Sequence, residues 1–225
     1  MKKNTQGFTL VEIAIVLVII GLLLGGILKG QEMITQAKIK NLIADFSGVS
    51  AAYHGYQDRY RALPGDDPNA DTRWTTAPAA VKGNGNGVVG GTYNNANAQC
   101  TLAAPPAGEA CNWWDHLRRA GFVAGTGPQL PFNAVTGFIG VQTGNGAEPP
   151  TAALGGFVAL IMCSANLPDK MAIAVDTQMD DASAITGTVR GQLHTAGPNP
   201  AINAAADAAN YVENGTNVYT LCRAL

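Results

Sequence analysis

Residues 7–28 read GFTLVEIAIVLVIIGLLLGGIL, and this stretch decides the fold because it combines membrane length with a single charge. From Phe8 to Leu28 there are 21 residues, which a helix rising about 1.5 Å per residue extends to about 32 Å, enough to cross the hydrocarbon core of a bilayer. Lys2 and Lys3 precede the run, and the positive-inside rule keeps such an end in the cytoplasm. The exception within the run is Glu12, an acid among apolar side chains.

The residues around this segment distinguish it from an ordinary secretory signal. Such a signal has a small-residue cleavage site after its apolar run, whereas this run is followed by Lys29, Gly30 and Gln31. The conspicuous small residue, Gly7, precedes the run instead. Cleavage after Gly7 would remove a short charged leader and leave Phe8 as the amino terminus of an intact apolar helix, which makes sense if the helix is kept for use.

The amino-terminal sequence KKNTQGFTLVEIAIVLVIIGLLL resembles the class III leader of type IV pilins and type II secretion pseudopilins. The family motif is G-F-T-L-x-E before an apolar helix, and it is matched by Gly7, Phe8, Thr9, Leu10 and Glu12. The resemblance directly covers roughly residues 1–35. It implies cleavage after Gly7 by a prepilin peptidase, methylation of the new Phe8 amine, and packing of the helix into a filament core.

Glu12 acquires a role from this resemblance. A charged side chain at the bilayer centre costs about 2.5–3.5 kcal/mol on insertion scales, so Glu12 is expected to lie near the interface, to be protonated, or to have a partner. In the family the partner is the ammonium group of the neighbouring subunit's first residue, here Phe8, which exists only after cleavage. Glu12 would then set the register between subunits. The other interpretation is an incidental acid on the membrane face.

One position departs from the family pattern. Many relatives have a proline in the middle of this helix, where the present chain has Lys29. Glycine weakens a helix by about 1 kcal/mol relative to alanine, so local melting is one interpretation of the glycines around Lys29, and a small-residue face for close helix packing is the other. These glycines are Gly21, Gly25, Gly26 and Gly30.

Beyond Gly30 the apolar residues change rhythm and recur at intervals of three and four, as in an amphipathic helix. Nothing breaks the pattern before Pro64, so one helix is predicted from about Phe8 to Tyr60. The apolar positions of its second half are Ile39, Leu42, Ile43, Phe46, Val49, Tyr53, Tyr56 and Tyr60. The predicted organisation is a leader (1–7), a transmembrane or filament-core half of the helix (8–30), an amphipathic half (31–60) and a globular head (61–225) with a long loop (64–112).

The head is predicted to be an antiparallel sheet laid on the second half of the long helix, so that the fold class is α+β and pilin-like. A short helix is expected over residues 113–120, before Gly121. Runs rich in β-branched or aromatic residues between turn signals predict the strands. They are placed at about 137–142, 156–163, 170–176 and 217–222.

Four cysteines follow the apolar run, and an even number behind a membrane-targeting segment favours disulfides in an oxidising compartment. Three pairings are open. We favour Cys100–Cys111, which brackets a short loop containing proline and glycine, and Cys163–Cys222, which ties down the carboxyl end. Chain entropy gives about 3 kcal/mol for the first bridge and about 4 kcal/mol for the second. Buried free thiols are the alternative.

Composition and motifs argue against a nucleic-acid-binding protein and against an enzyme. The net charge is −2 and the isoelectric point is near 5.9, which gives no basic face. The glycine-rich residues 82–91 lack the Gly-Lys-Ser/Thr ending of a phosphate-binding loop, and Lys82 and Tyr93 stand where an EF-hand needs acids. His54, His116 and His194 are scattered, so no catalytic site is visible and no cofactor is expected.

One group of acids is a candidate cation site. Asp176, Asp180 and Asp181 place three carboxylates within six residues, and the resemblance to pseudopilins, whose major members include calcium-binding proteins, makes calcium the relevant ion. The competing interpretation is a turn capped by its own aspartates. Asp66 and Asp67 are interpreted as a turn of that kind.

The resemblance implies a structural function. The chain would be a single-pass inner-membrane precursor with a cytoplasmic amino terminus, and then a subunit of a periplasmic or cell-surface filament. Its partners would be further copies of itself in a helical filament, the prepilin peptidase, a membrane platform protein and an assembly ATPase. The sequence does not distinguish a pilus subunit from a pseudopilus subunit, or a major subunit from a minor one. A non-polymerising, membrane-anchored periplasmic binding module and an anchored hydrolase are the alternatives.

Overall fold

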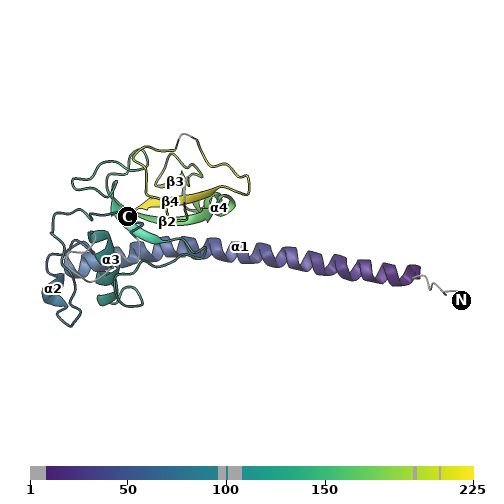
Figure 1. Cartoon of the computed structure of the whole chain (residues 1–225), viewed down its shortest axis with the longest axis horizontal. Coiled ribbons are helices and arrows are strands. Elements are labelled where there is room, and N and C mark those ends of the chain that lie inside the picture. Colours follow the sequence, from purple (N-terminus) through teal and green to yellow (C-terminus); the bar gives the residue numbers. More distant parts are fainter. Residues whose placement is uncertain (1–8, 96–99, 101–107, 195–196, 208) are drawn as a thin grey trace, which may run out of the picture. The chain divides into compact units, whose positions relative to one another are not determined.

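The computed structural model describes residues 9–95, 100, 108–194, 197–207 and 209–225. The chain divides into two compact units, residues 1–38 and 39–225, and the long helix α1, Leu10–Tyr60, contributes to both (Figure 1). The predicted end of this helix at Tyr60 is confirmed. Its predicted beginning at Phe8 lies outside the described residues. The glycines of its first half do not interrupt it, because the helix is continuous through all of them.

The second half of α1 buries one face in the core of the head. Six of the eight predicted apolar positions are buried, Ile43 and Tyr60 are only partly buried against the core, and Ala52 is an addition. Tyr53 stacks on Trp113 of helix α3 (Glu109–Arg119) with ring centroids 5.5 Å apart. Trp113 and Trp114 are both buried in the same cluster. The buried residues of this face are Ile39, Leu42, Phe46, Val49, Ala52, Tyr53 and Tyr56.

Four antiparallel strands form the sheet of the head, which confirms the predicted α+β class (Figure 1). In chain order they are β1 (Ile139–Thr143), β2 (Leu160–Pro168), β3 (Val189–Leu193) and β4 (Val218–Ala224), and in the sheet they lie in the order β1-β2-β4-β3. The register of β2 against β4 shifts between Ser164 and Leu167, as a β-bulge would produce.

Both faces of the sheet are covered. Met162 and Leu221 belong to the main core together with α1 and α3, whereas Ile161 and Cys163 point into a second cluster formed with Tyr93 and other loop residues. Alternate residues of a strand face opposite sides, so a sheet covered on both sides is apolar at successive positions. This explains why the first six residues of β2 are all buried.

One predicted strand is wrong. Residues 170–176 lie in helix α4, Asp169–Met179, and strand β3 at Val189–Leu193 was not predicted. The alternation of Met171, Ile173 and Val175 resembles a strand, but helix α4 buries Asp169, Ala172, Val175 and Asp176, which are spaced by three, three and one. That spacing is the helical one, and the intervening alanines favour a helix.

The predicted long loop, residues 64–112, contains helix α2 (Ala70–Arg73) and the beginning of α3. Its turn at Asp66-Asp67 is buried. Asp67 accepts a hydrogen bond from the Tyr56 hydroxyl at 2.6 Å and pairs with Arg73 at 2.5 Å. The loop is therefore fastened to α1 through a charged hydrogen-bond network.

Candidate assembly site on the amino-terminal helix

The first turn of α1 is closed by Thr9 and Glu12. The Thr9 backbone N–H and its hydroxyl both donate to Glu12 Oε2, at 2.8 Å each. In return the Glu12 backbone N–H donates to Thr9 Oγ1 at 3.3 Å. This reciprocal arrangement is a capping box, and it places the one acid of the apolar run at the exposed start of the helix. The predicted processing residues, Gly7 and Phe8, lie outside the described residues.

The capping box is a role of Glu12 that the sequence analysis missed. Its signal is present in the chain, because a threonine followed three residues later by a glutamate before an apolar run is the capping-box pattern. The family motif by itself assigns Thr9 no contact. The structure shows it in direct contact with the Glu12 carboxylate.

The apolar side chains of the first half of α1 are exposed throughout. Leu10 is 86% exposed and Ile20, the least exposed of the large apolar residues up to Leu28, is 46% exposed. The helix is long and apolar enough to cross a membrane, and none of its most apolar window is buried in the protein. No described atom lies near the Cβ positions of Gly21 and Gly25. This surface is therefore open to lipid or to another chain.

The two predicted disulfides, Cys100–Cys111 and Cys163–Cys222, are present. Cys163 and Cys222 are directly opposite each other in β2 and β4, so this bridge joins the two central strands of the sheet. It also fixes the register of strand β4, and the residue directly after this strand, Leu225, donates to the Leu160 carbonyl at 3.0 Å.

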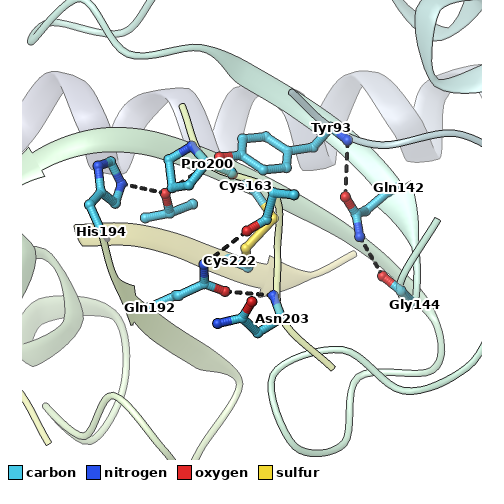
Figure 2. Close-up of a disulfide and its surroundings, with 11 residues drawn as sticks. Tyr93, Gln142, Gly144, Cys163, Gln192, His194, Pro200, Asn203 and Cys222 are labelled. Carbon is cyan, nitrogen blue, oxygen red and sulfur yellow. Dashed lines mark hydrogen bonds between the residues drawn. A yellow bond between two sulfur atoms is a disulfide. The ribbon is translucent and has the colours of Figure 1, made fainter. Parts of the chain in front are cut away.

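Buried amide side chains surround the second disulfide and fasten the covering loops to the sheet (Figure 2). Gln142 accepts the backbone N–H of Tyr93 at 3.0 Å and donates to the Gly144 carbonyl at 2.6 Å. On the other side, Gln192 accepts the backbone N–H of Asn203 at 2.7 Å. Buried polar groups of this kind are stable only when paired, so these contacts specify where the loops lie.

The three aspartates predicted as a cation site do lie together. One carboxylate oxygen from each of Asp176, Asp180 and Asp181 lies within 4.8 Å of the others. Burial, together with the negative charges of Asp181 and Asp180, raises the pKa of Asp176 to about 6. Carboxylate oxygens suit calcium. The protein also engages them itself, because Tyr211 donates to Asp176 at 2.6 Å and the Val189 backbone donates to Asp180 at 2.9 Å.

The glycine-rich loop at residues 82–91 wraps around the protein's own acids. The backbone N–H groups of Gly85 and Gly87 donate to Asp66 at 2.6 and 2.7 Å, and that of Gly90 donates to Glu109 at 3.2 Å. A cradle of backbone N–H groups binds anions, and here the anions are internal carboxylates.

His116 of α3 is hydrogen-bonded to the backbone through both of its ring nitrogens. The Gly65 backbone N–H donates to His116 Nδ1 at 2.9 Å, so that Nε2 carries the proton and donates to the Val81 carbonyl at 2.8 Å. Burial lowers the pKa of His116. Both ring nitrogens are thus engaged by backbone groups.

Comparison with known proteins supports the amino-terminal site. Residues 2–28 match the family described as the prokaryotic N-terminal methylation motif. This motif is a class III signal peptide typical of type IV pilins and pseudopilins. No curated protein and no solved structure gives a significant match to the chain. The resemblance of residues 7–12 to these leaders is therefore confirmed.

Proposed function

We propose that this chain is a structural subunit of a type IV pilus-like or type II secretion pseudopilus filament. It is made as an inner-membrane precursor, cleaved after Gly7, and polymerised through α1, with Glu12 pairing to the Phe8 amine of a neighbouring copy. The observation that carries the proposal is the match of residues 2–28 to the methylation motif together with the exposure of the apolar helix that begins within these residues.

The exposed helix needs a partner in either of its proposed states. Burying apolar surface contributes about 25 cal/mol for each Å² removed from water, and the large side chains of this segment are 46–86% exposed from Leu10 to Leu28. In the precursor the partner is lipid, and in the filament it is the same helix of other copies. The compact unit of residues 39–225, which contains the head and the second half of α1, would then form the filament surface.

The capping box supplies the precursor with a local partner for Glu12. Before cleavage, the Glu12 carboxylate is held by Thr9, so an acid near the membrane interface is hydrogen-bonded within its own chain. After cleavage, the Phe8 ammonium of a neighbouring copy offers a partner with a full positive charge, whereas both Thr9 donors are neutral, so a direct attraction between unit charges is added. A neighbouring copy in register can therefore compete for Glu12.

The proposed partners follow from this route. A prepilin peptidase would cut after Gly7 and methylate Phe8, while a membrane platform protein and a cytoplasmic ATPase would drive assembly. The precursor would cross the inner membrane once with its amino terminus in the cytoplasm, and the filament would be periplasmic or on the cell surface. The alternative is a membrane-anchored periplasmic binding module that never polymerises.

Mass spectrometry of the mature amino terminus is the first test. We expect a chain that begins at Phe8 with one added methyl group on its amine. An intact Met1, or a cut after the apolar run, would contradict the proposal. Electron microscopy of periplasmic and cell-surface fractions then separates a filament from a module that stays monomeric.

The second test concerns Glu12 itself. We expect Glu12→Gln to abolish or strongly reduce filaments while leaving the precursor in the membrane, because the substitution keeps the shape and removes the charge. Glu32→Gln is the matched control, since Glu32 lies on the same helix and pairs with Lys29 at 2.8 Å. Filaments of normal number in Glu12→Gln cells would remove the register role of this residue.

Calcium at Asp176, Asp180 and Asp181 is a separate proposal within the same function. We expect millimolar calcium to raise the melting temperature of the full chain relative to a chelator, and Asp180→Asn to remove the increase. Asp58→Asn, at an exposed position on α1, is the control. An identical melting temperature with calcium and with chelator would identify the cluster as a self-capped turn.

A further inference from the structure

A pocket lies in the head beside the carboxyl-terminal half of α3. Its volume is about 580 Å³, within the range of roughly 300–1,000 Å³ that is usual for sites of small organic ligands. Residues 76–78 and 125–129 form its walls, and α3 contributes Asp115, Arg118 and Arg119. Two arginines and one aspartate give the lining one positive charge in excess, on a chain whose net charge is −2.

The two arginines of the pocket are held in place by hydrogen bonds, one through the Asp115 side chain and the other through backbone carbonyls. Arg119 Nε donates to Asp115 Oδ2 at 2.6 Å. Arg118 Nη1 donates to the carbonyl oxygens of Gly127 and Gln129, at 2.7 Å each. Guanidinium groups fixed in this way are preorganised, which reduces the entropy lost when a ligand binds.

Two polar atoms in this lining have no hydrogen-bond partner within the described part of the chain. They are Asp115 Oδ1 and Arg118 Nε, and the Asp115 side chain is only 1% exposed. Buried polar atoms without partners are uncommon in native proteins, and each one requires an explanation. Here the acceptor and the donor both belong to residues that line one pocket, which points to a ligand that offers a donor and an acceptor together.

We propose that this pocket binds an acidic sugar, through the carboxylate and a hydroxyl group of a uronic-acid unit. The carboxylate would pair with Arg118 and Arg119, because guanidinium groups bind carboxylates through parallel hydrogen bonds. The hydroxyl would donate to Asp115 Oδ1. This site is independent of polymerisation and goes beyond the proposed filament function.

The lining favours this ligand class over other anions. A phosphate ion would leave the exposed polar walls without hydroxyl groups to contact, and a cation would be repelled by the two arginines. A peptide carboxyl terminus would find only Ala77, Pro78 and Pro128 as apolar wall, with no large apolar side chain to bury its own. The exposed side chains of Thr76, Thr126 and Gln129 instead suit a hydroxyl-rich molecule.

The electrostatics of Arg118 agree with an anionic ligand. Burial lowers the pKa of the Arg118 guanidinium, and the negative charge of Asp115 raises it. A bound carboxylate would add a second negative charge close to a partly desolvated cation. The pair would therefore be stronger than an exposed surface ion pair.

Calorimetric titration of the full chain tests the proposal, in a detergent that has no sugar headgroup. The probes are galacturonic acid, galactose, acetate, inorganic phosphate and dialanine. We expect galacturonic acid to bind, and each of the other four probes to bind at least about tenfold more weakly. Each of the four lacks the carboxylate, the hydroxyl next to it or the other sugar hydroxyls. Equal binding of any of the four, or no binding of galacturonic acid, overturns the proposal.

Variants locate the binding site. We expect Arg118→Gln to weaken galacturonic acid about tenfold or more, and Arg61→Gln, at an exposed arginine after α1, to leave it unchanged. Because Arg118 also holds two loop carbonyls, Thr126→Trp provides a second variant that fills the pocket and keeps both arginines. Wild-type affinity in Thr126→Trp overturns the assignment. Lost affinity with an unchanged melting temperature supports it, whether or not filaments form.

Discussion

The two halves of α1 have the same secondary structure and opposite surroundings. In the first half Leu17 is 64% exposed and Leu22 is 74% exposed, whereas in the second half Leu42 and Phe46 are fully buried. Most helical stability in soluble proteins comes from packing of an apolar face, and the second half follows that rule within its own chain. The first half has no such packing within its own unit, so the burial of its apolar side chains must be provided by lipid or by other copies.

A pair of identical substitutions tests this difference most strongly. We expect Leu42→Ala to lower the free energy of unfolding of the head by about 3–5 kcal/mol, through lost burial and a residual cavity. Leu17→Ala removes the same atoms from the exposed half and should change head unfolding by less than about 0.5 kcal/mol. Urea unfolding of the full chain in micelles, followed by tryptophan fluorescence, measures both.

The reverse ranking is expected for assembly. Leu17→Ala removes apolar surface that only lipid or another copy can cover. Filament yield should therefore fall in Leu17→Ala although the free energy of unfolding of its head is nearly unchanged. Equal effects of the two substitutions on head unfolding would contradict the division of α1 into a self-packed half and an open half.

The Cys163–Cys222 bridge gives the next largest effect. It closes a separation of 59 residues, and bridges of this kind typically contribute about 2–4 kcal/mol by restricting the unfolded chain. We expect the double substitution to serine to cost that amount in the head, with amide exchange in the first half of α1 unchanged. The Cys100–Cys111 bridge spans a separation of only 11 residues, so replacing both of its cysteines by serine should lower the stability of the head by less.

The fold was predictable where one physical signal dominated. A long apolar run and then a regular stripe specify α1, and the order of strand-like segments specifies the antiparallel class. The failure at α4 has a physical cause, because Met171, Ile173 and Val175 alternate as in a strand while burial follows the helical spacing from Asp169 to Asp176. Strand β3 is short and has Gly191 at its centre, and because glycine is depleted in strands its five residues give only a weak signal.

The candidate site was predictable at the level of motif and not of contacts. The roles of Gly7, Phe8 and Glu12 follow from the resemblance to the family motif and stay predictions, while the Thr9 cap required the capping-box pattern to be applied at the same place. The pocket beside α3 could not be predicted, because Asp115 and Arg119 line it only together with the loop of residues 125–129. Nothing in the sequence of the short helix indicates that this loop lies next to it. Long-range contacts of this kind leave no local pattern.

A pH-dependent contribution distinguishes the head from the first half of α1. Glu109 accepts the backbone N–H groups of Asn84 at 2.9 Å and Gly90 at 3.2 Å. Burial, and then the charges of Asp66 and Glu148, raise its pKa to about 7. Because the folded-state pKa is above the unfolded value of 4.5, the protonated Glu109 contributes its full stabilisation to the head below pH 4.5. This contribution is lost as the pH rises from 4.5 to about 7 and the carboxyl group ionises in the folded head.

Glu109→Gln isolates this contribution. We expect the variant to gain about 1–2 kcal/mol over the wild type between pH 5 and pH 8, after discounting for partial exposure of the carboxylate. His116, whose pKa is lowered by burial, gives the opposite dependence and is present in both proteins, so it cancels in the difference. Parallel stability curves for the two proteins would show that Glu109 titrates normally.

The smallest effect lies at the other end of the chain, in the Thr9 cap. Thr9→Val keeps the shape of the side chain and removes the hydroxyl that bonds Glu12, which should cost about 1 kcal/mol of local helix stability. Amide exchange at Glu12 and Ile13 in the uncleaved chain should then be roughly fivefold faster, with head unfolding unchanged. Thr9→Ser, which keeps the hydroxyl, should exchange as the wild type does. If valine and serine behaved alike, the Thr9 hydroxyl would not help to hold the Glu12 carboxylate, and an incoming Phe8 amine would have only the backbone hydrogen bond of residue 9 to displace.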